Sequence, residues 1–253
     1  MIDLHCHLLP AVDDGSRSVA QSVRVLTRFA ADGVTAVCLT PHLLASEAAE
    51  PPLAHEAAFE TLRLAAPTVP TLHRGAEVML DRPLPAAVAE RRTVTLAGSR
   101  YILVEFPRLV AYQTVANALH LVVQLGLVPL LAHPERYACC SPGAVEAWRR
   151  LGALMQVDAT TLASGGSRGD RARQLVARGL ADVLAADNHG DGRGLVLARE
   201  LLLEHGGEAQ ADLLLVANPA AIVTDAVVEV VPPLELRASL AERLRRLFQR
   251  EDA

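Results

Sequence analysis

Residues 1–16 read MIDLHCHLLPAVDDGS, and the first strand of the fold is expected within this stretch. Apolar residues interrupted by polar ones over the opening positions predict a strand near residues 2–7. Two of the polar residues are His5 and His7, and Asp13 and Asp14 follow in the next turn. Burying such groups at the start of a core is unfavourable unless something binds them. The stretch therefore predicts a binding site at the end of the first strand.

The rest of the chain alternates short apolar segments with amphipathic helical segments, the pattern of repeated β-α units. Further strands are predicted near 34–40, 71–78, 101–106, 127–132, 153–158 and 181–187. Helices are predicted near 17–32, 53–65, 84–91, 114–125, 143–151, 167–178 and 193–205. Several strands, such as YILVEF, are apolar at nearly every position, as expected when both faces of a parallel sheet are covered. Seven such units close more readily into a barrel than into an open sheet.

The chain of 253 residues is expected to form a single domain, because α/β barrels commonly reach this length undivided. The barrel is assigned to about 1–217 and a helical extension to about 218–253. The segment LLLVA, residues 213–217, is predicted to form one more short strand. The amphipathic segment at 235–252 is predicted to form a helix that covers the barrel base or joins a partner subunit, which leaves a homo-oligomer open.

Composition argues against several classes of protein. The formal net charge is -5, and the charges are dispersed rather than gathered into a basic stripe, which argues against a nucleic-acid partner. Neither a membrane-spanning apolar run nor a signal peptide is indicated. The four cysteines include no C-x-x-C pair, and the adjacent Cys139 and Cys140 are poorly placed for an ordinary disulfide. We expect a cytoplasmic protein with reduced thiols that does not insert into a membrane.

Eight residues of metal-ligand type fall at or just beyond the carboxyl ends of six predicted strands. They are His5, His7, His42, Glu77, Glu105, His133, Asp187 and His189. Active sites of (β/α) barrels are assembled at that end, so these side chains are expected to converge. Imidazole and carboxylate ligands without thiolates suit Mn²⁺, Fe²⁺, Zn²⁺ or Mg²⁺. The set is too large for one ion, and two or three neighbouring ions suit hydrolytic attack on phosphorus.

The other histidines receive a different interpretation because none of them follows this pattern. His55, His73, His120 and His205 fall in helices, at a helix end or at a strand start, and are expected to be structural or surface residues. Cys6 alternates with the two imidazoles of the first strand, so it is expected to be a small buried residue rather than a ligand.

The motifs resemble the PHP (polymerase and histidinol phosphatase) family, and within it the bacterial capsular polysaccharide tyrosine phosphatases. The matching stretches are MIDLHCHLLPAVDDGS, GVTAVCLTPH, RGAEV, ILVEFP, AHPERY and ADNH. They span residues 1 to about 193. The resemblance implies a single PHP phosphatase domain, folded as a distorted TIM-like (β/α)₇ barrel. It also implies two or three metal ions per chain, most often manganese.

The resemblance further implies nine metal ligands in three sets. The first set is His5, His7, Glu77 and Asp187. The second set is Glu77, Glu105 and His133, with Glu77 shared. The third set is Asp14, His42 and His189. Asp13 is assigned to the turn or to a contact with a ligand.

Two arginines are implied to bind phosphate. Arg136 lies in HPERY, and Arg193 follows the D-x-H motif, although a surface arginine at the start of a helix is the alternative for Arg193. Guanidinium groups suit phosphate oxygens because they present paired donors. The chain departs from the family pattern at Asp158, Ala186 and Asn188, which leaves substrate preference open.

The favoured function is that of a metal-dependent protein-tyrosine phosphatase. Its substrate would be the phosphotyrosine tail of a bacterial tyrosine autokinase that regulates capsule or exopolysaccharide export. One alternative is a PHP-family phosphatase for a small molecule, such as histidinol phosphate or a sugar phosphate. Another is a regulator that binds phosphotyrosine without hydrolysing it. A cysteine-dependent phosphatase is excluded, because none of the cysteines is followed by arginine at the C-x₅-R spacing.

Overall fold

The computed structural model describes residues 1–236, and its strands and helices alternate along most of that length. The strands are β1 (Ile2–Cys6), β2 (Ala36–Leu39), β3 (His42–Leu44), β4 (Thr71–Arg74), β5 (Glu77–Met79), β6 (Tyr101–Glu105), β7 (Val128–Ala132), β8 (Leu154–Asp158) and β9 (Val183–Ala185). The α-helices are α1 (Val19–Ala31), α2 (Leu53–Ala65), α3 (Ala86–Arg91), α4 (Tyr112–Gln124), α5 (Pro142–Arg150), α6 (Ala159–Ala163), α7 (Gly166–Ala177), α8 (Val196–Glu204), α9 (Glu208–Asp212) and α10 (Asn218–Val223). Three shorter helical segments are η1 (Leu96–Gly98), η2 (Pro134–Arg136) and η3 (Leu213–Ala217).

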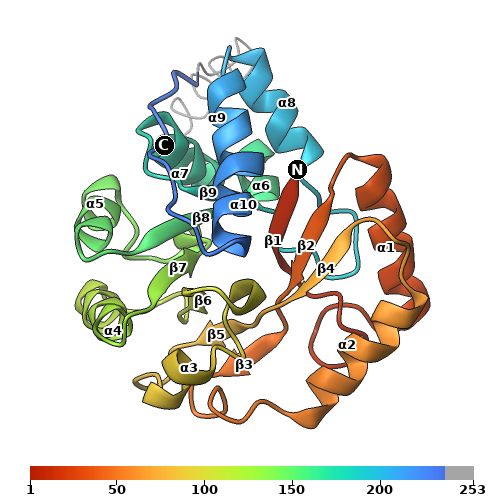
Figure 1. Cartoon of the computed structure of the whole chain (residues 1–253). Coiled ribbons are helices and arrows are strands. Elements are labelled where there is room, and N and C mark those ends of the chain that lie inside the picture. The colour runs from red at the N-terminus through yellow and green to blue at the C-terminus, as the bar shows by residue number, and fades with distance from the viewer. Residues whose placement is uncertain (237–253) are drawn as a thin grey trace, which may run out of the picture.

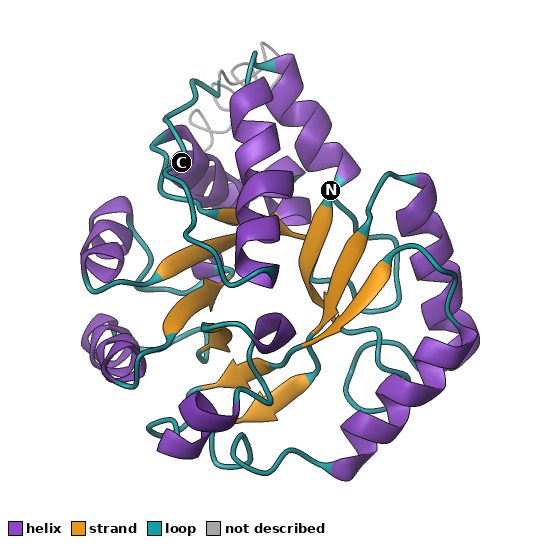
Figure 2. Ribbon diagram, viewed as in Figure 1, coloured by secondary structure: helices purple, strands orange, loops and turns teal. Residues whose placement is uncertain are grey.

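The strands form two parallel sheets that together make a barrel. The strand orders are β1-β2-β4 and β3-β5-β6-β7-β8-β9. The sheets are joined because β2 leads through Thr40 and Pro41 into β3, while β4 leads through Gly75 and Ala76 into β5. A parallel bridge between Cys6 and Asn188 connects β1 to the segment after β9. Figure 1 and Figure 2 show the strands at the centre and most helices outside them, which confirms the predicted distorted barrel.

The break between the two sheets has a local cause. Pro41 has no backbone N–H, so it cannot continue the ladder of hydrogen bonds between strands. Pairing resumes with the Glu77 N–H, which donates to the Pro41 carbonyl at 3.1 Å. The single strand predicted near 71–78 is therefore two strands, and His42 begins a strand that the sequence did not predict.

Apolar side chains fill the barrel below the strand ends. An inner cluster contains Leu103, Leu130 and Val183 from the strands, with Leu96 of η1 and Ile222 of α10. Leu103 precedes Glu105, Leu130 precedes His133, and Val183 precedes Asp187 along the chain. The apolar cluster therefore occupies the amino-terminal part of the barrel, and the polar residues collect at the carboxyl ends of the strands.

The prediction of a strand at LLLVA is wrong. Residues 213–217 form η3, a π-helical segment that joins α9 to α10 in one continuous helical rod (Figure 1). Leu214 and Leu215 are buried against the barrel in this helical form. The bridge between Cys6 and Asn188 closes the barrel, so LLLVA finds no strand edge to extend.

Two further predictions concern the carboxyl-terminal part of the chain. The helix predicted at 235–252 lies outside the described residues except for its first two positions. Up to residue 236, none of the helices combines the length and apolar character needed to cross a membrane.

The loop after β1 folds back onto its own strand. The Ser16 N–H donates to the His7 carbonyl at 2.9 Å, and the Ala11 N–H donates to the Ser16 carbonyl at 2.8 Å. A Cβ atom at Gly15 would lie 2.1 Å from the His7 carbonyl oxygen and 2.4 Å from the His7 Cβ. Only glycine therefore allows the loop that carries Asp14 to approach the strand this closely.

Substitution of Gly15 tests this close approach. We expect Gly15→Ala to lower the free energy of unfolding by about 1–3 kcal/mol, because backbone atoms must move to accept the methyl group. Gly143→Ala is the matched control, since a Cβ there would meet no atom of the described chain within 4 Å. Gly143 lies in α5, where alanine should raise stability by about 0.5–1 kcal/mol. Urea denaturation of both variants measures the difference, and equal stabilities would contradict the interpretation.

Candidate metal centre

The nine predicted ligand side chains come together at the carboxyl ends of the strands. Their donor atoms form four groups, and within each group the atoms lie within 4.8 Å of one another. The groups are His5–His7–Asp187, His5–Glu77–His133, His42–Glu77–Glu105 and His7–Asp14–His42–His189. His5, His7, His42 and Glu77 each belong to two groups, so the four groups form one continuous cluster.

Glu77 is the centre of this cluster. Its Oε2 lies 3.1 Å from His5 Nε2, 3.2 Å from His7 Nε2 and 3.1 Å from His42 Nδ1. Its Oε1 lies 2.9 Å from His133 Nε2. The residue is fully buried, so imidazoles rather than water surround its carboxylate.

Neighbouring side chains fix the orientation of the two imidazoles of β1. His5 Nδ1 lies 2.9 Å from Gln156 Oε1, and His7 Nδ1 lies 2.8 Å from Asp13 Oδ2. Both contacts are satisfied when Nδ1 carries the proton, which leaves each Nε2 available as a ligand. The Asp13 contact agrees with the prediction that this residue holds a ligand rather than acting as one.

This arrangement fits a metal cation. The two Nε2 atoms lie 3.1 Å apart, and both face Glu77 Oε2, an atom without a hydrogen-bond partner in the described chain. In neutral imidazoles protonated on Nδ1, these nitrogens present lone pairs to each other and to the carboxylate. A cation bound among them removes that repulsion and satisfies the unpartnered oxygen.

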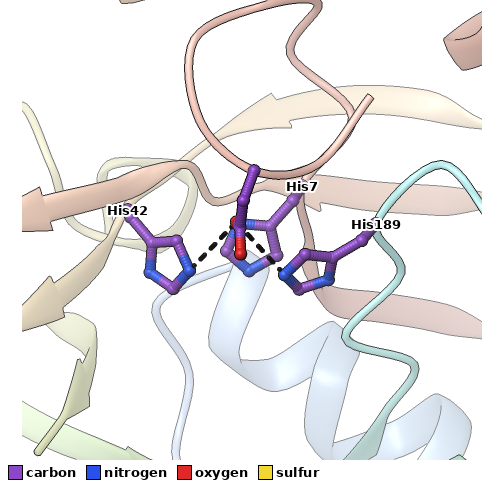
Figure 3. A group of neighbouring side chains, drawn as sticks. His7, His42 and His189 are labelled. Carbon is purple, nitrogen blue, oxygen red and sulfur yellow. Dashed lines mark ion pairs between the residues drawn. The ribbon is translucent and has the colours of Figure 1, made fainter. Parts of the chain in front are cut away.

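A second part of the cluster lies nearer to solvent. Figure 3 shows the rings of His7, His42 and His189 grouped together, and its dashed lines mark the ion pairs that His42 and His189 make with Asp14. Asp14 Oδ1 lies 3.4 Å from Nε2 of both His42 and His189. The Asp14 side chain is 69% exposed and that of His42 39%, whereas the side chains of His5 and His7 are fully buried. The cluster therefore extends from the barrel interior to an open mouth.

The charges within the cluster stabilise one another. Burial alone lowers the pKa of His7, but the adjacent carboxylates of Asp13, Asp187 and Glu77 outweigh it and raise that pKa well above the usual value. Burial also lowers the pKa of His42, but the carboxylates of Glu105 and Glu77 outweigh this effect and raise that pKa to about 10. Burial raises the pKa of Glu77, but the surrounding histidines bring it well below its usual value. Protons thus supply the positive charge in the absence of metal, and metal binding would displace them.

Backbone strain occurs at two of the strand ends. His133 has φ 34° and Asp187 has φ 48°, the left-handed region that non-glycine residues seldom adopt. His133 directly follows β7 and Asp187 comes two residues after β9, and both side chains belong to the cluster. Strain of this kind persists where the surrounding structure holds it and is often associated with a functional site.

The two predicted phosphate-binding arginines lie beside the same carboxylate. Arg136 Nη2 contacts Asp158, and it lies 2.5 Å from Asp187 Oδ2. Arg193 Nη1 lies 3.4 Å from the same Asp187 oxygen, and its Nε lies 2.8 Å from Asp191 Oδ2. Both guanidinium side chains are partly exposed, so they border the cluster on a side that solvent reaches.

Two residues that contact the cluster were missing from the predicted site. The first is Gln156, whose Oε1 contacts His5 Nδ1. The second is Asp3, whose Oδ1 accepts hydrogen bonds from the His5 and Ala186 N–H groups at 3.2 and 3.1 Å. Asp3 thereby ties β1 to the end of β9. Strand periodicity contained the signal for both, because Asp3 shares a face with His5, and Gln156 shares one with Asp158.

The chain is similar to proteins of known family. Residues 1–224 match the family described as capsular polysaccharide synthesis, CpsB/CapC. The tyrosine-protein phosphatase YwqE of Bacillus subtilis is 35% identical over 143 residues, which cover 54% of this chain and 55% of that protein. The tyrosine-protein phosphatase CpsB of Streptococcus pneumoniae is 28% identical over 245 residues, covering 90% of this chain and 100% of CpsB.

A solved structure shares the fold. It comes from work on YwqE of Bacillus subtilis and CpsB of Streptococcus pneumoniae, described as unique metal-dependent tyrosine phosphatases. It superposes with a TM-score of 0.79 at 24% identity and covers 94% of this chain and 100% of the solved one. The predicted resemblance is confirmed: the chain belongs to the CpsB/CapC family of capsular polysaccharide synthesis.

Proposed function

We propose that this chain is a metal-dependent protein-tyrosine phosphatase. The observation that carries the proposal is the buried cluster around Glu77. Imidazole nitrogens and carboxylate oxygens face one another there, and Glu77 Oε2 has no hydrogen-bond partner among residues 1–236. Two arginines border the cluster where solvent can reach. The relatives named tyrosine-protein phosphatases support the same reaction.

The proposed ligand sets are those that the family resemblance implies. In the structure, His133 groups with His5 and Glu77, whereas Glu105 groups with His42 and Glu77, so the second set combines members of two groups. The first ion would be held by His5, His7, Glu77 and Asp187. The second would be held by Glu77, Glu105 and His133. The third would be held by Asp14, His42 and His189. Mn²⁺ is the proposed metal, and the same donors also suit Fe²⁺, Zn²⁺ or Mg²⁺.

When bound, the ions supply Lewis acidity toward phosphoryl oxygens and lower the pKa of coordinated water. The arginines supply the remaining positive charge. Arg136 is held through Nη2 by Asp158 and Asp187, while its Nε and Nη1 make no hydrogen bond within residues 1–236. Those nitrogens are available to bind the phosphate oxygens that become more negative in the transition state.

The leaving group explains why no dedicated proton donor is required. A tyrosine side chain has a pKa of about 10, so its phenolate leaves with less help from an acid than a serine alkoxide would need. A cysteine nucleophile is disfavoured by the structure as well as by the sequence. Burial raises the pKa of Cys6 well above its usual value, so its thiol stays protonated.

The proposed substrate is the phosphotyrosine tail of a bacterial tyrosine autokinase, and the proposed process is regulation of capsule or exopolysaccharide synthesis. Membership of a family of capsular polysaccharide synthesis supports this choice. The role requires the enzyme to share the cytoplasm with the kinase tail.

The substrate class can be tested by comparing two phosphomonoesters. With Mn²⁺ added, kcat/KM for a phosphotyrosine peptide should exceed that for histidinol phosphate by at least about 100-fold, and chelation should abolish both activities. Release of inorganic phosphate measures each rate. Fast hydrolysis of histidinol phosphate with no turnover of the peptide would favour a small-molecule phosphatase. Binding of the peptide without hydrolysis by metal-loaded protein would favour a non-catalytic regulator.

Replacement of Arg136 tests its role at the phosphate. Arg136→Ala should lower kcat by about 100-fold, the usual effect of removing one donor that stabilises transition-state charge. Metal content, measured by elemental analysis, should stay unchanged. Arg178→Ala is the matched control, since this arginine is exposed and its one ion pair within residues 1–236 is the 4.0 Å contact with Glu146. If Arg136→Ala loses metal, the arginine would instead serve to hold Asp187 in position as a metal ligand.

Replacement of Glu77 tests the centre of the cluster. Glu77→Gln should lose at least one metal ion per chain, because an amide binds these cations more weakly than the carboxylate that it replaces. The rise in melting temperature that Mn²⁺ gives the unsubstituted protein should shrink correspondingly. Glu146→Gln removes a carboxylate that is about half exposed and serves as the control. Elemental analysis and thermal unfolding measure both effects, and an unchanged metal content would refute the assignment.

A further inference from the structure

A cavity lies outside the barrel wall, and none of the nine candidate ligands lines it. It has a volume of about 550 Å³ and is bounded by the β2–β3 and β4–β5 strands, by α2 and by the segment around η1. Its apolar lining includes Leu39, Phe59 and Leu72, and Leu53 at its margin is 87% exposed. Cavities of this size bind small organic molecules, and this one can be reached from solvent.

The charged residues of the cavity are already paired with each other or with neighbours. Arg74 Nη2 lies 2.7 Å from both Glu56 and Glu60, and its guanidinium stacks 3.8 Å above the Phe59 ring. Arg92 Nη1 lies 3.2 Å from Asp225 Oδ2. No arginine is therefore left over to bind an anion, and the cavity is complementary to an uncharged molecule.

Two imidazoles provide the polar character that remains. His55 and His73 line the cavity, and neither ring makes a hydrogen bond to any residue from 1 to 236. Burial lowers the pKa of both, and for His55 this outweighs the opposite effect of Asp13 and Glu47. A neutral imidazole offers one donor and one acceptor, which a hydroxyl group can match in either tautomer.

The rigid part of the lining suits a flat molecule. Pro41, Pro51 and Pro52 line the cavity together with the Phe59 ring. Aromatic rings pack well against such apolar surfaces and carry few rotatable bonds, so little conformational entropy is lost on binding. The apolar surfaces suit an aromatic ring, the two imidazoles suit a hydroxyl group, and the paired charges leave no partner for a charged group. Together they are complementary to an aromatic alcohol.

The cavity also contacts the strands that carry two candidate ligands. Pro41 and Ala76 line it, and the next residues along the chain are His42 and Glu77. His42 begins β3 and Glu77 begins β5, so a molecule in the cavity contacts the chain directly before each of these strands. The wall is tightly packed: a Cβ at Gly75 would lie 3.0 Å from Leu96 Cδ2 and 3.2 Å from Thr40 Cγ2.

We propose that this cavity is an effector site for an uncharged aromatic alcohol, which changes turnover by shifting the strand segments that hold His42 and Glu77. The effect on turnover rests on the proposed phosphatase function, whereas the binding itself does not. The occupant lacks the phosphate group that the cluster would bind, and the cavity offers no unpaired arginine for one, so the two sites differ in the group that they recognise.

Binding is tested with 4-phenylphenol as the probe and 4-phenylbenzoate as its charged counterpart, by titration calorimetry on the metal-loaded full chain. We expect one molecule of 4-phenylphenol per chain and at least tenfold weaker binding of the benzoate. The double variant His55→Phe/His73→Phe should lose at least tenfold in affinity. His120→Phe is the control, because that exposed histidine pairs with Gln124 on α4. Circular dichroism verifies that each variant is folded.

Turnover is tested with p-nitrophenyl phosphate in the same proteins. Saturating 4-phenylphenol should change kcat at least twofold without competing with substrate, and the double variant should lose this response. Absence of saturable binding, equal binding of the benzoate, or binding that leaves kcat unchanged would overturn the proposal. A protein that binds 4-phenylphenol yet hydrolyses no phosphomonoester would contradict the proposed function instead.

Discussion

The structure depends on one buried carboxylate, that of Glu77. A charge removed from water costs several kcal/mol unless opposite charge surrounds it at close range. Imidazoles from β1, β3 and the end of β7 surround this carboxylate, and each comes from a different part of the chain. The barrel is the arrangement that brings these parts within 3.2 Å of one carboxylate. Bound cations would supply the charge that protons supply in their absence.

Much of the barrel could be predicted because its signals are local. Apolar runs of strand length and amphipathic helices recur along the chain, and α2 begins and ends at the residues predicted. Interruptions of the sheet were harder to predict. The break at Pro41 interrupts hydrogen bonding only because a neighbouring strand pairs with this part of the chain, and the sequence does not show which strand that is. The strand prediction for LLLVA was wrong for a related reason. An apolar run of this length suits either a strand or a buried helix, and the closed barrel leaves no strand edge for it to join.

The convergence of the candidate site was predictable to a similar extent. Parallel strands present their carboxyl ends to the same face, so His5 and Asp187 were expected to meet although they are far apart in sequence. The sequence does not determine which donor atoms share a partner. His42 reaches both Glu77 and Asp14 through its two ring nitrogens, and this follows from the position of β3 after the break at Pro41.

Asp158 shows how a departure from the family pattern connects the fold to the proposed chemistry. Its Oδ1 accepts hydrogen bonds from the Thr160 and Thr161 N–H groups at 2.7 and 3.0 Å, which caps α6, while its Oδ2 contacts Arg136. An asparagine could also cap the helix but would carry no charge for the guanidinium. Arg136 is therefore fixed by two carboxylates, Asp158 and Asp187, so its orientation is set without any ligand. An arginine held in place in this way loses less conformational entropy on binding its ligand, and only its remaining nitrogens take part in recognition.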